Sequence, residues 1–241
     1  MNKTLKILTV IMAVLFLAGI PVFAFTFGQR SLAKNEFEET AEQMQEAIEA
    51  NEIDATTGTL NYDSYKFALN NATRDMADGE QIVHINIGFG SLDRGLKYIN
   101  DTYGHLNGRP AIQDFAAILK QVFPEEEGWT ICHRGGSSFL VFGRGDFDED
   151  ILLGYYETMR SKWHDTPYQV ADGSGTVEGM ALYFCASVAP ECGTSFKELR
   201  DILVYKKLAL RDITNCGYVI VTSPDHYICS ENIDETAYME D

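Results

Sequence analysis

The sequence is poor in basic residues. Its 241 residues include 19 Lys and Arg against 36 Asp and Glu, which gives a formal net charge of −17. No acid lies in residues 1–30, so the acidity belongs to the rest of the chain. A domain that holds nucleic acid by its phosphates needs an excess of positive charge. We therefore expect no nucleic-acid partner.

Metal-binding spacings and a disulfide framework are also lacking. The five cysteines form no C-x-x-C pair, and the five histidines show no H-x-x-x-H spacing. An odd number of cysteines argues against a complete set of disulfides and favours a reducing compartment. The histidines predict no metal centre. Internal repeats are absent as well.

A long apolar run stands near the N-terminus. Ile7–Phe27 is 21 residues without a charge, which matches the span of a helix across a bilayer. Residues 1–29 are thus expected to form a single-pass transmembrane anchor. The alternative is a cleaved signal peptide, with Lys3 and Lys6 as its basic region and a small-residue site ending at Ala24. We favour the anchor, because the apolar run continues past that site.

Residues 30–53 follow with a helical pattern. Phe37, Ala41, Met44 and Ile48 are spaced 4, 3 and 4 apart, which predicts an amphipathic stalk helix with a short coiled-coil seam. This seam could pair two chains into a homodimer. A helix that packs on its own domain explains the pattern equally well.

Helical and strand patterns then alternate. Residues 81–89 alternate apolar and polar side chains like a strand, and further strands are expected at 129–134, 139–142, 179–189 and 217–222. Helices are expected at 62–76, 92–102, 111–122, 148–163 and 195–212. The fold class is α/β with a mixed sheet flanked by helices. Residues 224–241 read as a solvated acidic tail, which has five acids and no base from Ser230 onward.

Three segments in order carry a family resemblance. They are Asp54–Asn61 (DATTGTLN), Lys97–Gly108 (KYINDTYGHLNG) and Gly135–Phe139 (GGSSF). This series resembles the GGDEF family, the diguanylate cyclases that join two GTP molecules into cyclic di-GMP. The resemblance implies a nucleotidyl-cyclase-like domain over residues 54–223, with a mainly antiparallel central sheet.

The hairpin motif differs from the family at the two acidic positions that serve catalysis. Gly135, Gly136 and Phe139 are kept, and we expect the two glycines at the tip of a hairpin and Phe139 packed inside the domain. The two acids of the family motif, however, are replaced by Ser137 and Ser138. Neutral hydroxyls neither offset the charge of a magnesium ion nor help to ionise an attacking hydroxyl. We therefore expect no catalytic residue in this degenerate hairpin.

The metal ligands implied by the resemblance are missing too. Counted back from Asn100, the two family Asp positions fall on Leu92 and Arg94, and Asp93 lies between them. No bound metal is expected, with Asp93 as the one displaced candidate ligand. Magnesium and GTP become cofactors only if the chain is a working cyclase.

The resemblance implies a remnant of the nucleotide site at Asn100, Gly104, His105 and Gly108. Arg109 replaces the family's guanine-binding Asp, and as a donor-only side chain it does not accept hydrogen bonds from guanine. The alignment also puts Thr214 and Tyr218 at the phosphate-binding Lys and Arg. Members of the family often have an inhibitory product-binding site with the motif R-x-x-D. Glu126 and Trp129 occupy the Arg and Asp positions of this motif here, so we expect no such site.

Together these features predict a membrane-anchored, degenerate GGDEF protein that acts as a signalling or interaction module with an unknown protein partner. The charges that flank the anchor do not orient it, and we favour a cytoplasmic domain. Two alternatives stay open. One is an active diguanylate cyclase, and the other is an exported domain without nucleotide chemistry.

Overall fold

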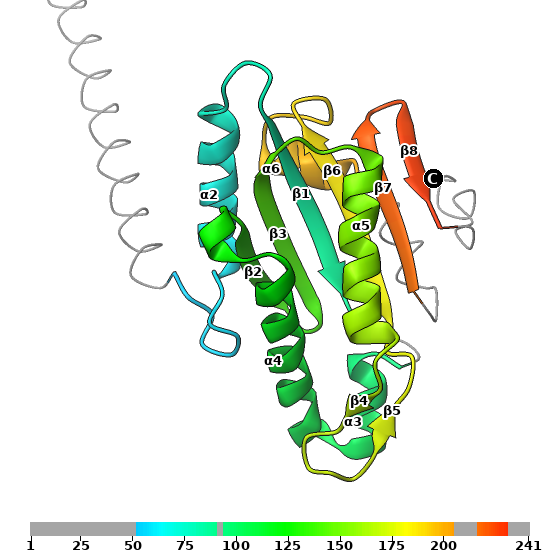
Figure 1. The fold of residues 1–241 in the computed structure, drawn as a ribbon. Helices are drawn as coiled ribbons and strands as arrows, with labels where there is room; N and C mark the ends of the chain where they lie inside the picture. Colours follow the sequence, from blue (N-terminus) through cyan, green and yellow to red (C-terminus); the bar gives the residue numbers. More distant parts are fainter. Residues whose placement is uncertain (1–51, 91–93, 205–215, 231–241) are drawn as a thin grey trace, which may run out of the picture. The chain divides into compact units, whose positions relative to one another are not determined.

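A six-stranded sheet organises residues 52–90, 94–204 and 216–230, the parts of the chain that this computed structural model describes (Figure 1). Its strands, in spatial order, are β2 (Thr130–Gly135), β3 (Ser138–Gly145), β1 (Gln81–Gly88), β6 (Leu182–Ala189), β7 (Cys216–Ser223) and β8 (His226–Cys229). β6 and β7 run parallel, and the other neighbours run antiparallel. The expected mixed, mainly antiparallel sheet is confirmed.

Helices cover both faces of the sheet. They are α2 (Tyr62–Arg74), α3 (Leu96–Tyr103), α4 (His105–Val122), α5 (Glu149–Met159) and α6 (Phe196–Asp201), and α5 continues into a π-helical turn, η2 (Arg160–His164). α3, α4 and α5 pack on one face, and α2 and α6 pack on the other. In Figure 1, α4 and α5 lie in front of the sheet and α6 lies behind it. A short 3-10 helix, η1 (Glu125–Glu127), and a separate hairpin of β4 (Tyr168–Gln169) and β5 (Thr176–Val177) complete the domain.

β1 shows how the sequence pattern places one sheet between two layers of helices. Side chains alternate across a strand, so Val83, Ile85 and Ile87 face α4 and α5, while Ile82 and His84 face α2 and α6. All five are fully buried. The His84 ring is accommodated because its Nδ1 forms a 2.8 Å hydrogen bond with the Tyr65 hydroxyl. β1 is therefore a central strand that carries polar groups on one face only.

Side-chain caps set the helix starts. The Asn61 side chain accepts a hydrogen bond from the Ser64 amide at 2.9 Å, and Asp148 accepts one from the Ile151 amide at 2.8 Å. Helix α4 differs from expectation, because it begins at His105 rather than Ala111. Helix α3 begins at Leu96 rather than Leu92, after Gly95, whose missing side chain leaves room for the carbonyl oxygen of Phe89.

Two short elements escaped the sequence analysis. His226–Cys229, placed in the acidic tail, instead forms β8 and pairs with β7, so the sheet extends past the expected end of the domain at residue 223. The β4–β5 hairpin was not expected either. Both are too short for an alternating pattern to be recognised. Of the helix expected at 195–212, α6 spans Phe196–Asp201, and residues 205–215 lie outside the described ranges.

The expected anchor at 1–29 and nearly all of the stalk at 30–53 also lie outside the described residues. At the stalk's end, Ile53 forms an antiparallel bridge with Leu60. Within residues 52–90, 94–204 and 216–230, no helix has the length and apolar character to span a bilayer.

Candidate functional site

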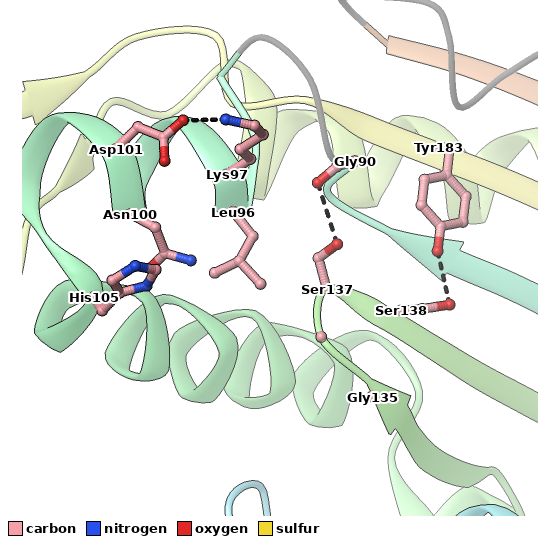
Figure 2. Close-up of a pocket in the computed structure, with 11 residues that line it drawn as sticks. Gly90, Leu96, Lys97, Asn100, Asp101, His105, Gly135, Ser137, Ser138 and Tyr183 are labelled. Carbon is pink, nitrogen blue, oxygen red and sulfur yellow. Dashed lines mark hydrogen bonds and ion pairs between the residues drawn. The ribbon is translucent and has the colours of Figure 1, made fainter.

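A cleft of about 460 Å³ lies between the β2–β3 hairpin and helix α3. It brings together two of the three motif segments found in the sequence (Figure 2). Its lining comprises Gly90, Leu96, Lys97, Asn100, Asp101, His105, Gly135, Gly136, Ser137, Ser138 and Tyr183. Tyr183 comes from β6 and was not expected at the site.

The hairpin forms as predicted, with its tip one residue later. Gly135 pairs with Ser138, so the two turn residues are Gly136 and Ser137 rather than Gly135 and Gly136. The φ angles of Gly135 and Gly136 are 124° and 56°, which side chains other than glycine rarely adopt. Phe139 is fully buried beside Phe115, with ring centroids 5.4 Å apart. Its expected structural role is confirmed.

The two hairpin serines are engaged with neighbouring protein groups. Ser137 Oγ donates to the carbonyl oxygen of Gly90 at 3.1 Å, and the Tyr183 hydroxyl donates to Ser138 Oγ at 2.8 Å (Figure 2). The hairpin also packs tightly against β1, because a Cβ atom on Gly88 would lie 2.2 Å from the carbonyl oxygen of Ser137. This floor of the cleft presents neutral hydroxyls and backbone groups, with no carboxylate.

Of the positions aligned with the family's metal ligands, the structure describes only Arg94. Arg94 adopts a positive φ of 57° and donates from Nη1 to the carbonyl oxygen of Glu178 at 3.1 Å, outside the cleft lining. Leu92 and Asp93 fall outside the described ranges. Within those ranges, no group of three or more His, Cys, Asp or Glu side chains is placed to hold a metal ion.

The nucleotide-remnant residues lie at the corner between α3 and α4. Asn100 and His105 line the cleft, and Figure 2 shows both at its α3 side. Gly104 has a φ of 87° and ends α3. Gly108 permits a close approach, since a Cβ atom there would lie 2.1 Å from Asn100 Oδ1. The two glycines therefore serve the backbone and the placement of Asn100. Arg109 is exposed and does not line the cleft.

The formal charges of the cleft cancel. Among its lining residues, Lys97 and Asp101 form an ion pair along α3 (Figure 2). No other lining residue is an Asp, Glu, Lys or Arg. The lining therefore carries one exposed ion pair and otherwise backbone, hydroxyl, amide, imidazole and apolar groups.

His133 was not expected at the site, and its side chain contacts the hairpin at Gly136 and Phe139. Its Nε2 donates to the carbonyl oxygen of Gly136 at 3.0 Å, and its Nδ1 lies 3.1 Å from Asp54 Oδ1. The ring packs on Phe139 with centroids 4.9 Å apart. Burial works to raise the pKa of Asp54, but hydrogen bonds from Thr57 and His133 outweigh it and hold that pKa below its ordinary value.

Sequence comparisons give no relative: no family model and no curated protein matches the chain. Solved structures do match. The GGDEF domain of TpbB (YfiN) from Pseudomonas aeruginosa superposes with a TM-score of 0.60 at 20% identity, covering 70% of this chain and 94% of that one. The coiled coil and GGDEF domain of DgcB from Caulobacter crescentus, in complex with c-di-GMP, gives 0.58 at 15% identity, covering 79% and 97%.

A third similar structure is the diguanylate cyclase SiaD from Pseudomonas aeruginosa in complex with its activator SiaC. It gives a TM-score of 0.55 at 16% identity, covering 90% of this chain and 83% of that one. At these identities the likeness shows the fold. The chain has the fold of a GGDEF domain.

Proposed function

We propose that this chain is a degenerate member of the GGDEF family that acts in cyclic di-GMP signalling as a non-catalytic signalling or interaction module. The fold and the ordered motif series support the family assignment. One observation carries the loss of catalysis: the hairpin hydroxyls of Ser137 and Ser138 are neutral and are hydrogen-bonded to Gly90 and Tyr183. They supply no charge for a metal ion or for an attacking hydroxyl.

The other replaced positions reinforce this proposal. Arg94 holds the carbonyl oxygen of Glu178, and Arg109 is exposed away from the cleft lining. Tyr218, aligned with a phosphate-binding cation, packs instead against the Tyr156 ring at a centroid distance of 4.9 Å. Each lost charge-assisted contact costs a ligand about 1.5–3 kcal/mol, so two or three weaken binding by several powers of ten.

Isothermal titration of the full-length chain with GTP and magnesium tests this proposal directly. We expect no binding in the micromolar range and no cyclic di-GMP product by chromatography. A micromolar Kd would overturn the loss of nucleotide binding. Product formation would show that the chain is a diguanylate cyclase with displaced ligands.

We also propose that Ile7–Phe27 anchors the protein in a membrane by a single pass, with the domain on the cytoplasmic side. The uncharged 21-residue run supports this placement. A reporter fused after Asp241 should be active in the cytoplasm. Activity of an export-dependent reporter would instead support an exported domain without access to GTP.

We further propose that the stalk at residues 30–53 pairs two copies of the chain. Confinement to one membrane raises the effective concentration, which helps a short seam to associate. Cysteines introduced at Met44 should cross-link in membranes, and Gln45, outside the apolar seam, is the matched control. Equal cross-linking at both positions would contradict the proposed seam. We also propose that an unidentified protein partner binds the domain. The similar SiaD structure contains a bound protein, its activator SiaC.

A further inference from the structure

A second hollow lies away from the cleft, along the outer edge of β2. This β2-edge groove has a volume of about 510 Å³ and is bordered by the segment 52–60, α2, the end of α4 and η1. Its apolar lining includes Phe123, Trp129 and Ile131, which are buried, together with Leu60 and Ile53. Ile53 is 54% exposed, so it offers an accessible apolar surface at the mouth of the groove.

The backbone at this edge is already occupied. The Leu60 amide donates to the carbonyl oxygen of Ile131 at 3.0 Å, and the His133 amide donates to the carbonyl oxygen of Leu60 at 3.1 Å. An additional strand therefore finds few free backbone groups along β2. Recognition in the groove must come from side chains.

The rim of the groove is acidic. Glu52, Glu125 and Glu126 line it and are exposed. Lys120 also lines it, but its Nζ donates to the carbonyl oxygens of Thr57 and Gly58 at 3.0 and 3.1 Å. The one basic side chain of this lining thus holds the 52–60 segment, and the carboxylates dominate the field at the rim.

Charge discriminates among the possible occupants. Residues 31–50 contain six Glu against a single Lys34, and residues 230–241 contain five acids and no base. Residues 205–215 are basic, with Lys206, Lys207 and Arg211 against Asp212, but this segment connects α6 to β7, and three strands separate β7 from β2. The three bases of residues 1–30 flank the apolar run expected in the membrane. A second copy of this chain carries a net charge of −17. Nucleotides are anionic as well. The acidic rim repels these anionic candidates and attracts a cationic segment.

We propose that the β2-edge groove docks a cationic amphipathic segment of another protein. Its apolar side chains would pack against Ile53, Leu60 and Trp129, and its Lys or Arg residues would pair with Glu125 and Glu126. This inference goes beyond the proposed function, because it names the partner's chemistry and uses a surface separate from the cleft. It stands whether or not the cleft binds nucleotide.

The test uses the full-length chain in nanodiscs of neutral phosphatidylcholine, with empty nanodiscs subtracted. The probe is a fluorescent synthetic amphipathic peptide of leucine and lysine, and its counterpart has glutamate in place of lysine. We expect saturable binding of the lysine peptide by fluorescence anisotropy. Raising the salt from about 50 to about 300 mM should weaken it, because the pairs lie at an exposed rim.

Variants assign the binding to the groove. Glu125→Lys combined with Glu126→Lys should weaken binding by about tenfold or more, and Ile53→Asp should do the same through the apolar wall. The matched control is Asp78→Lys combined with Asp225→Lys, which makes the same charge change at exposed positions elsewhere. It should change the Kd by less than about twofold.

Three results would overturn the proposal. They are an equal loss of binding in the control and groove variants, comparable binding of the glutamate peptide, and absence of saturable binding. The first would show general attraction to an acidic protein. Circular dichroism of each variant confirms that the fold is retained, and Ile53→Asp keeps the test open if the double reversal unfolds the chain.

Discussion

The His133 imidazole joins the hairpin to a segment 79 residues earlier in the chain, through a 3.1 Å contact between its Nδ1 and Oδ1 of Asp54. The same carboxylate oxygen accepts hydrogen bonds from the Thr56 and Thr57 amides at 3.1 and 3.0 Å. His133 Nε2 holds the carbonyl oxygen of Gly136. Asp54 and His133 thus form a bridge between the segment 52–60 and the hairpin tip.

Breaking this bridge should loosen the hairpin. His133→Phe keeps a ring against Phe139 but removes both hydrogen bonds, and we expect it to destabilise the domain by about 1–3 kcal/mol in urea unfolding. The Phe89 amide donates to the carbonyl oxygen of Ser137 at 3.3 Å. Its hydrogen exchange should therefore accelerate in the variant. Unchanged exchange at Phe89 would contradict a role for His133 in holding the tip.

Asp54 should contribute to the pH dependence of stability. Its hydrogen bonds lower its pKa in the folded state below the ordinary value of about 3.9. The contribution is thus fully present above about pH 4 and is lost as the pH falls through the folded-state pKa. Urea unfolding between about pH 6 and pH 2 should show a steeper acid loss of stability for the native chain than for Asp54→Asn. Parallel pH profiles would contradict this linkage.

The hydroxyls of Tyr183 and Ser138 should show energetic coupling. We expect a double-mutant cycle of Tyr183→Phe and Ser138→Ala to give a coupling of about 0.5–1.5 kcal/mol, because each single change removes the same 2.8 Å hydrogen bond. Ser195→Ala, at the start of α6, provides a control cycle with Tyr183→Phe. That control should be additive within about 0.5 kcal/mol. Equal coupling in both cycles would indicate a general loss of structure.

Restoring the hairpin acids should not create a cyclase. Ser137→Asp combined with Ser138→Glu returns two carboxylates to the hairpin, but Leu92 and Arg94 still occupy the aligned metal-ligand positions. A metal-dependent transfer needs its ligands together, and their effects are not additive. Chromatography after incubation with GTP and magnesium should detect no cyclic di-GMP. Product from this double variant alone would show that the metal ligands lie elsewhere.

Gly88 should tolerate no side chain. In Gly88→Ala, the new Cβ would meet the Ser137 carbonyl oxygen at 2.2 Å and the Tyr183 hydroxyl at 2.6 Å. We expect a loss of about 2–3 kcal/mol or more in thermal or urea unfolding. The control is Gly154→Ala in α5, which meets no atom within 4 Å and should stabilise the chain by about 0.5–1 kcal/mol. A neutral effect at Gly88 would mean that the hairpin does not pack on β1 this closely.

Local patterns in the sequence determined much of the fold. Apolar alternation at 81–89 located β1, and the paired glycines between two apolar strands located the hairpin within one residue. The helices expected to begin at residues 62 and 148 begin at Tyr62 and Glu149, each after a residue whose side chain caps the helix, Asn61 and Asp148. These features depend on neighbours a few residues apart, which is the range over which side-chain periodicity and backbone preferences act.

The site, in contrast, was decided by tertiary structure. Tyr183 meets Ser138 because β6 and β3 both pair with β1, and that register brings together residues 45 positions apart. His133 meets Asp54 across a similarly long separation, and the left-handed backbone at Arg94 accompanies its bond to Glu178 outside the cleft lining. A periodic pattern states which face of a strand a side chain occupies. Which distant group it meets follows only from strand pairing and the packing of helices on the sheet.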